Sequence, residues 1–211
     1  MDNANLPGDH GVCAIQGRCE GLVRVQVFHP RLGGEERGER QPYWRQEAVA
    51  GLADYANQPP WLLGHLHSAS HPCPVGGIPE AAEPGPKKWP LVVFSHGLAG
   101  TCEMYSQLCR CISSLGFVVI ALEHEDGSGS YAEKADSTSI LYCRPDSTPY
   151  SREKVLGFRG PMLDQRVNEI NALLDWISGV AATSGGGQGM KQGRTLRGHW
   201  QACSRTPTVA P

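Results

Sequence analysis

The 211-residue sequence lacks the features that mark membrane and secreted proteins. No apolar run approaches the ~18 residues that a membrane-spanning helix requires. The first residues, MDNANLPGDHGV, contain neither a basic region nor an apolar stretch, so no secretory signal peptide is visible. These absences predict a cytoplasmic protein whose contact with membranes is peripheral.

The sequence also lacks an excess of charge of either sign and any CxxC pair. Its formal net charge is −2, which gives no indication of a nucleic-acid partner. Without a secretory signal, its eight cysteines are expected to be free thiols rather than a disulfide framework. Glycine (26) and proline (16) make up about a fifth of the chain, so long irregular loops are expected.

The stretch WPLVVFSHGLAG, residues 89–100, organises the rest of the chain. The apolar run 91–94 predicts a strand buried on both faces. A glycine-rich turn follows, and then a helix with Thr101 as its N-cap and one apolar face: Met104, Leu108, Cys111, Ile112 and Leu115. Residues 117–122 predict a second buried strand. The resulting βαβ unit implies a parallel sheet.

A His-Gly-X turn at the end of a buried strand has two interpretations. It is an ordinary glycine-rich loop, or it carries an oxyanion-hole N–H of the kind found in esterases. Ser95 and His96 are adjacent on an extended chain and point to opposite faces, so His96 is not expected to serve Ser95 as a base.

The strings PLVVFSHGL and LGFVVIALEHEDGS, with Tyr105-Ser106 between them, closely resemble the platelet-activating-factor acetylhydrolase family in its plasma and type II intracellular forms. The resemblance covers roughly 23–178. It implies an α/β-hydrolase fold and a serine esterase, 1-alkyl-2-acetylglycerophosphocholine esterase. The implied substrates are platelet-activating factor and phospholipids with short or oxidised sn-2 acyl groups. No cofactor or metal is implied. The resemblance gives the Leu98 N–H the oxyanion-hole role, and Gly97 gives access to it.

Trp61, Leu62, Leu63 and Leu66 cluster in a short helix that Pro59-Pro60 would begin. These side chains pack in the core, or they form a face that contacts a lipid surface. The resemblance favours the lipid interface. The neighbouring His65, His67, His71 and Cys73 do not have the spacing of a common metal site, and we expect solvent-facing loop histidines and no metal.

The EHEDGS string, residues 123–128, follows the second strand. Three carboxylates around one histidine suggest either an acid–base site or a charged strand end held by ion pairs. The resemblance gives Glu123-His124 a scaffold role near the active site rather than a place in the triad.

The remaining segments predict a strand at 22–28, a short helix within 43–55, loops over 129–158 and an amphipathic helix over 161–178. In that last helix the apolar face is Leu163, Val167, Ile170, Leu174 and Ile177. We therefore expect a flexible arm (1–20), the N-terminal part of an α/β-hydrolase domain (21–178) and a non-homologous, disordered tail (179–211).

No serine has glycine both two residues before and two residues after it, so the nucleophile elbow of an α/β-hydrolase is missing from this sequence. The nucleophile, acid and base cannot be assigned, and the chain alone is expected to be inactive. The tail is then a truncated product, a splice product or a wrongly joined reading frame. The alternatives are a non-catalytic fragment that binds lipid surfaces or regulates, and an unstable product.

Overall fold

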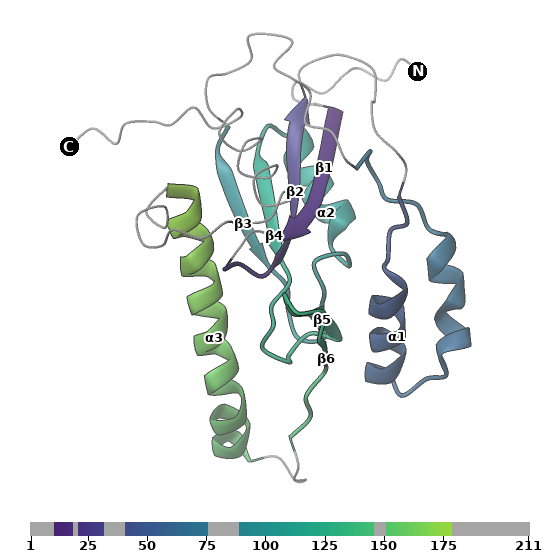
Figure 1. Ribbon diagram of the computed structural model, residues 1–211, viewed down its shortest axis with the longest axis vertical. Helices are drawn as coiled ribbons and strands as arrows, with labels where there is room; N and C mark the ends of the chain where they lie inside the picture. The colour runs from purple at the N-terminus through teal and green to yellow at the C-terminus, as the bar shows by residue number, and fades with distance from the viewer. Residues whose placement is uncertain (1–10, 19–20, 32–40, 76–88, 146–150, 179–211) are drawn as a thin grey trace, which may run out of the picture.

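The computed structural model describes residues 11–18, 21–31, 41–75, 89–145 and 151–178. They form a four-stranded mixed sheet with helices against both faces, which is the expected α/β class (Figure 1). The strand order is β1-β2-β4-β3. The segment predicted to be a disordered tail, 179–211, lies outside the described residues.

The predicted βαβ unit is present as β3 (Leu91–Ser95), α2 (Ser106–Ser114) and β4 (Val118–Leu122). β3 and β4 are parallel neighbours, with Ser95 opposite Leu122. The helix begins later than expected. Thr101 is not its N-cap, because the Thr101 hydroxyl accepts the Met104 N–H at 3.3 Å in a separate turn that precedes α2.

The strand predicted at 22–28 is β2 (Arg24–Arg31), which pairs antiparallel with β4 and so shares its sheet. The expectation of a flexible arm over 1–20 is wrong for residues 11–18, which form β1 (Gly11–Arg18), antiparallel to β2. Two glycines hide this strand in the sequence. Its residues Val12 and Ala14 are nevertheless buried, and Ala14 also bridges to Val75.

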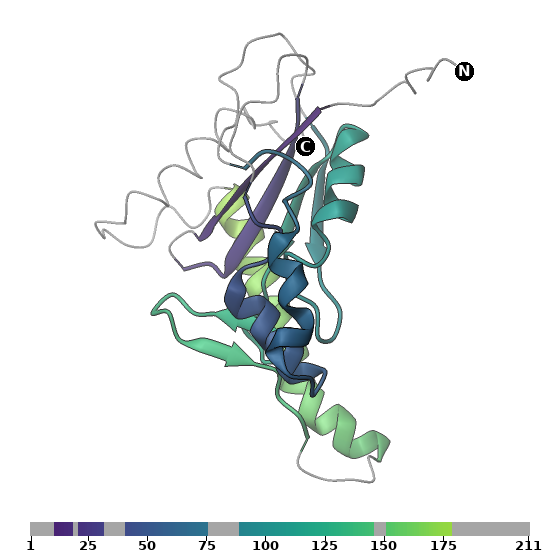
Figure 2. The same cartoon turned by 90° about the vertical axis from the view of Figure 1, so that its right-hand side faces the viewer.

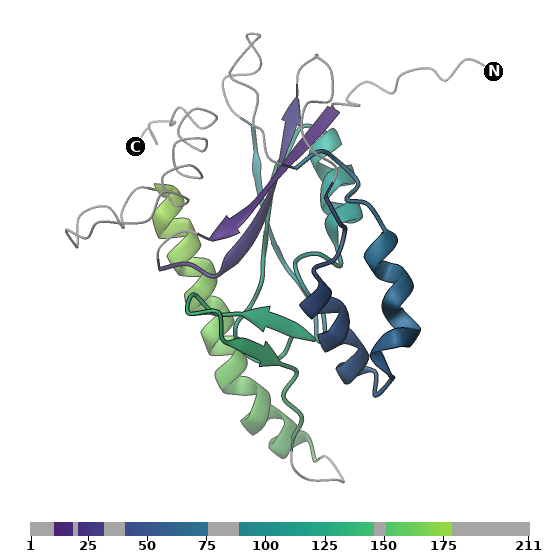
Figure 3. The same cartoon turned by 45° about the vertical axis from the view of Figure 1, so that its right-hand side comes forward.

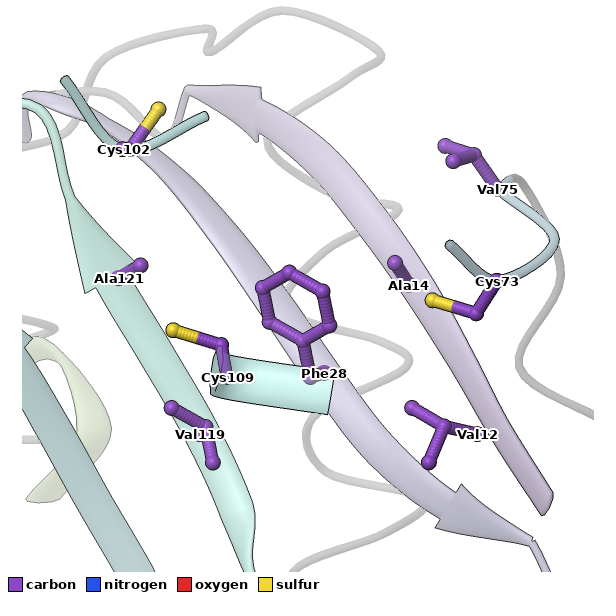
Figure 4. Close-up of a cluster of buried hydrophobic side chains, with 9 residues drawn as sticks. All are labelled: Val12, Ala14, Phe28, Cys73, Val75, Cys102, Cys109, Val119 and Ala121. Atoms are coloured by element: carbon purple, nitrogen blue, oxygen red, sulfur yellow. The ribbon is translucent and has the colours of Figure 1, made fainter. Parts of the chain in front are cut away.

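Two apolar clusters hold the helices to the sheet. On one face Phe28 and Val119 pack against Cys109 of α2 (Figure 4). On the other face Ile120 and Leu122 pack against Leu173 of α3 (Arg152–Ser178). Figure 3 shows the sheet between α2 and α3. Because β4 supplies side chains to both clusters, all five of its residues are buried.

β3 is less buried than predicted. Leu91 to Phe94 are only half-buried, because β3 lies at one end of the strand order and pairs with β4 alone among the described strands. This apolar run therefore forms an edge strand of the described sheet rather than a strand enclosed on both faces.

The helix expected within 43–55 is α1 (Gln46–Tyr55), and a 3₁₀ helix, η1 (Pro60–Ser68), runs beside it (Figure 2). Ala48 and Val49 of α1 are buried, and Leu63 and Leu66 of η1 pack against them.

Residues 129–158 are more regular than predicted. They include the hairpin of β5 (Tyr131–Glu133) and β6 (Ser139–Leu141), and α3 begins at Arg152, with Pro161 inside the helix. Glycines and a proline in the first part of α3 hide the true start of this helix in the sequence. In the described part of the chain, no helix is long and apolar enough to cross a membrane.

Candidate active site

The turn after β3 presents a backbone N–H to solvent. Leu98 is 57% exposed, and its N–H makes no hydrogen bond among the described residues. The next two amides along the chain are bonded, since the Ala99 N–H donates to the Ser128 carbonyl at 2.7 Å and the Gly100 N–H to the Gly97 carbonyl at 3.1 Å. An unbonded N–H in a fixed turn is what an oxyanion hole requires.

The turn is fixed by close packing as well as by hydrogen bonds. Ala99 has a φ of 60°, a conformation that a residue with a Cβ rarely adopts. A Cβ on Gly129 would lie 2.8 Å from the Gly100 carbonyl oxygen, so only glycine allows this approach.

Arg166 of α3 joins the turn to the loop after β4. Its Nε lies 2.7 Å from Asp126 Oδ2, its Nη1 donates to the His96 carbonyl at 2.5 Å, and its Nη2 donates to the Ser128 hydroxyl at 2.5 Å. Burial by itself raises the pKa of Asp126, but hydrogen bonds from Ser128 and Arg166 outweigh it, and the pKa lies below its usual value.

His96 is a buried, neutral part of this network. Its Nε2 accepts the His124 N–H at 3.2 Å, so its Nδ1 carries the proton and donates to the Gly97 carbonyl at 2.9 Å. Burial lowers the pKa of His96 to about 4, and His124 and Arg166 contribute in the same direction. As expected, the His96 ring does not serve Ser95.

A base does reach Ser95, from the loop after β4 rather than from the next residue. The Ser95 hydroxyl lies 2.7 Å from His124 Nε2, and His124 Nδ1 lies 2.6 Å from Glu169 Oε2 of α3. With Nδ1–H donating to the carboxylate, Nε2 accepts the Ser95 O–H. The sequence analysis missed this contact. The β3–β4 register was the available signal, because it places Ser95 opposite Leu122 and thus two residues from His124.

The string EHEDGS is divided between two networks. His124 and Asp126 face the turn. Glu123 instead pairs with Arg45, which also pairs with Glu103. Burial raises the pKa of Glu103, against the opposing charge of Arg45. The string therefore does not form one acid–base site, and most of its charges are held in ion pairs.

A cleft of about 620 Å³ lies beside that second network. Its lining is mainly polar and includes Gln16, Arg24, Arg45, Glu47 and Glu103. None of Ser95, Leu98 and His124 lines it, so the cleft is separate from the turn that presents the Leu98 N–H.

The predicted lipid-interface residues of η1 divide into two pairs. Trp61 is 77% exposed and Leu62 is 44% exposed. Leu63 and Leu66 are half-buried against α1. Core packing therefore applies to Leu63 and Leu66, whereas Trp61 and Leu62 are exposed.

The histidines near η1 also behave differently from one another. His65 and His67 are exposed, but His71 is buried and stacks on Phe28 with ring centroids 5.8 Å apart, so the expectation of a solvent-facing loop is wrong for His71. Among the described residues, no group of three or more His, Cys, Asp or Glu side chains is arranged to hold a metal ion. Cys102, Cys109, Cys111 and Cys143 are free thiols.

Comparison with solved structures finds a protein with a similar fold. The chain is similar to a ferulic acid esterase from Streptomyces cinnamoneus, with a TM-score of 0.52 and 17% sequence identity, over 81% of this chain and 47% of that one. At this identity the likeness concerns the fold alone. The described sheet and helices are therefore an α/β-hydrolase arrangement.

Comparison of sequences gives relatives in one family. A platelet-activating factor acetylhydrolase from Canis lupus familiaris is 37% identical over 165 residues, which are 72% of this chain and 35% of the relative. One from Gallus gallus is 39% identical over 99 residues, 44% of this chain and 23% of the relative. The chain thus spans about a third or less of the length of these relatives.

A family model extends the match along most of the chain. The model described as platelet-activating factor acetylhydrolase, isoform II, matches residues 13–190, beyond both limits of the expected resemblance at 23 and 178. Its start falls within β1, which accords with that strand belonging to the sheet. The chain belongs to the platelet-activating factor acetylhydrolase, isoform II, family.

Proposed function

We propose that this chain carries the oxyanion part of a phospholipid carboxylic-ester hydrolase of the platelet-activating factor acetylhydrolase type. The substrates would be platelet-activating factor and phospholipids with short or oxidised sn-2 acyl groups. The observation that carries the proposal is the unbonded N–H of Leu98, held in a turn that the Ala99–Ser128 hydrogen bond fixes. Family membership supports the choice of ester and of lipid.

In this function the Leu98 N–H would stabilise the negative oxygen that forms when a nucleophile attacks the ester carbonyl. One such donor contributes roughly 3–4 kcal/mol to lowering the barrier. Gly97, with no side chain, would leave the approach to that N–H open. The complete reaction also needs a serine nucleophile, a histidine base and an orienting acid.

We propose further that this sequence, which has no Gly-x-Ser-x-Gly, does not turn over phospholipid by the family's mechanism. The test is release of acetate from 1-alkyl-2-acetylglycerophosphocholine by the purified chain. We expect no release sustained beyond about one equivalent per chain, because loss of a triad nucleophile typically costs ~10⁶ in kcat. Sustained release that a single serine-to-alanine change abolishes would contradict the proposal.

A second candidate function, binding to lipid surfaces without catalysis, rests on the exposed side chains of Trp61 and Leu62. Exposed tryptophan and leucine on a short helix suit the boundary between headgroups and acyl chains. We expect the chain to co-sediment with phosphatidylcholine vesicles and Trp61→Ala to weaken this binding. Leu115→Ala is the matched control, since Leu115, the C-cap residue of α2, is 66% exposed. Equal binding by the chain and by W61A would argue against this function.

The remaining alternative, an unstable product without function, is tested by thermal unfolding. The buried clusters on both faces of the sheet favour a folded chain with a cooperative transition. A gradual, non-cooperative change in circular dichroism would support the alternative instead.

A further inference from the structure

We propose that Ser95, His124 and Glu169 form a nucleophile, base and orienting acid, and that Ser95 is acylated by small activated carboxylic esters such as aryl acetates. This activity does not rest on the function proposed above. It uses none of the family's missing triad and requires no lipid site. Ser95 is therefore assigned as a reactive serine in its own right.

The distances are those of a working nucleophile–base pair. The Ser95 hydroxyl is 2.7 Å from His124 Nε2, within the range that proton transfer requires. His124 is fully buried and 2.6 Å from Glu169 Oε2, so its ring is held in one orientation and one tautomer. The acidic partner therefore fixes the base with its acceptor nitrogen toward the serine.

Glu169 is itself held in place through its other oxygen. Oε1 accepts the Glu125 N–H at 3.2 Å and the Gln165 side-chain amide at 2.9 Å. These bonds leave Oε2 directed at His124. Glu169 acts through His124 and does not touch the reacting atoms, so we treat it as a positioning residue.

The serine is accessible while its base is not. Ser95 is exposed at the end of β3, whereas His124 lies behind it with its side chain completely shielded from solvent. An ester can therefore reach the Ser95 oxygen from solvent without displacing the histidine. No deep pocket is needed for a small aryl ester.

The charges near the serine favour an anionic transition state. Arg166 Nη1 lies 3.5 Å from the Ser95 oxygen. The other titratable neighbour of the His124 ring is His96, whose ring centroid is 5.0 Å away and which burial keeps neutral. The positive charge of Arg166 thus lies close to the serine oxygen at which the negatively charged transition state would form.

The reaction is a single acyl transfer. The Ser95 oxygen attacks the carbonyl carbon of p-nitrophenyl acetate, and the hydroxyl proton passes to His124 Nε2. The bond from the carbonyl carbon to the aryl oxygen then breaks, and p-nitrophenolate leaves. Acetyl-Ser95 remains, the imidazolium returns its proton to solvent, and Glu169 stays ionised throughout.

The test is intact-protein mass spectrometry with peptide mapping after treatment with p-nitrophenyl acetate and, separately, with a fluorophosphonate. We expect one added group per chain, on Ser95, and none in Ser95→Ala. The matched control is Ser68→Ala, which removes another exposed serine whose hydroxyl donates only to the His65 carbonyl. This variant should label like the unchanged chain.

Glu169→Gln and Glu169→Asp test whether Glu169 positions His124, while keeping a polar side chain at that position. We expect E169Q to slow labelling on the order of 10²-fold, because a neutral amide neither holds the His124 ring in the required tautomer nor stabilises the imidazolium that forms. E169D should recover part of the rate. Melting temperatures of both variants separate this effect from unfolding.

Three results would overturn the proposal. They are no labelling of the folded chain, labelling spread over several serines, and labelling of Ser95 at an equal rate in His124→Gln or in urea. Each would mean that the hydroxyl of Ser95 gains no reactivity from His124.

Discussion

The guanidinium of Arg166 donates a hydrogen bond of 2.5 Å to the carbonyl of His96. This contact ties α3 to the first peptide of the turn that presents the Leu98 N–H. Residues 70 positions apart in sequence thereby hold this turn in place. Because the same guanidinium pairs with Asp126, the turn and the loop after β4 depend on one side chain.

Replacing Arg166 with methionine should destabilise the fold by about 3 kcal/mol or more, since it leaves the buried carboxylate of Asp126 without its charged partner. Urea unfolding followed by circular dichroism measures the loss. The double variant Arg166→Met with Asp126→Asn should lose less than the sum of the two single variants, because the two residues act as a pair.

Arg152→Gln is the control for that experiment, because Arg152 lies exposed in the first turn of the same helix. Its effect should remain within about 0.5 kcal/mol. A loss in R166M no larger than that in R152Q would show that the contacts of Arg166 do not stabilise the fold.

Stability should fall as the pH is lowered from 6.5 to 4, partly through His96. The folded state keeps His96 neutral down to its pKa of about 4, whereas an unfolded histidine binds a proton below about 6.5. The unfolded chain therefore takes up more protons in this window, and the contribution of His96 reaches at most about 3 kcal/mol. This destabilisation by His96 is absent above about pH 6.5 and complete below about pH 4.

His96→Gln should reduce this pH dependence, because glutamine keeps an acceptor for the His124 N–H but cannot bind a proton. Unfolding free energies at pH 7 and pH 4.5 measure it. Half-buried His29 and buried His71, whose pKa values burial also lowers, should leave part of the slope in place. His65→Gln, at an exposed position, is the control. An unchanged slope in H96Q would contradict the prediction.

Two glycines inside helices should respond to alanine with opposite signs. A Cβ on Gly51 of α1 would lie 2.6 Å from the Ser130 carbonyl oxygen, so Gly51→Ala should destabilise by about 1–3 kcal/mol. A Cβ on Gly157 of α3 would meet nothing within 4 Å, so Gly157→Ala should stabilise by about 0.5–1 kcal/mol. Thermal unfolding of the two variants decides this, and a stabilising G51A would mean that α1 is not packed on the β5 segment.

The strands around the turn could be predicted from the sequence because their signals are local. The runs 91–94 and 117–122 are apolar and bounded by proline and glycine, and a βαβ connection makes them parallel. The structure confirms both strands and their direction. The position of Leu98 in a turn at the strand end follows from this unit alone.

The packed faces of the helices could be predicted only in part from apolar residues, since Ile170 and Ile177 of α3 and Ile112 of α2 do pack against the sheet. In α3, Leu163 and Val167 were expected to face the core but are more than half exposed, while Leu173 is buried. The face toward the sheet also carries Arg166 and Glu169, whose partners lie on other elements. A periodicity of apolar residues cannot identify a face that is held by ion pairs.

α2 shows the same limit on a smaller scale. Its predicted apolar face included Leu108 and Leu115, which are exposed, and the helix instead buries Ser106, Cys109 and Ser113. Ser106 donates to the Gln26 side chain of β2 at 2.9 Å. Small side chains allow the helix to approach the sheet closely, but a pattern of apolar residues does not identify the face on which they lie. The Ser95–His124–Glu169 contacts join polar side chains of β3, the loop after β4 and α3, and a pattern of apolar residues does not predict such contacts.

The proposed oxyanion role of Leu98 depends on its N–H being unbonded in a fixed turn, and amide hydrogen exchange measured by NMR tests this directly. We predict that the Leu98 amide exchanges rapidly while the Ala99 amide, bonded to the Ser128 carbonyl, is protected. Arg166→Met should reduce the protection of Ala99 and leave Leu98 fast. Equal protection of Leu98 and Ala99 would contradict the account, because the N–H would then be occupied and could not serve as an oxyanion donor.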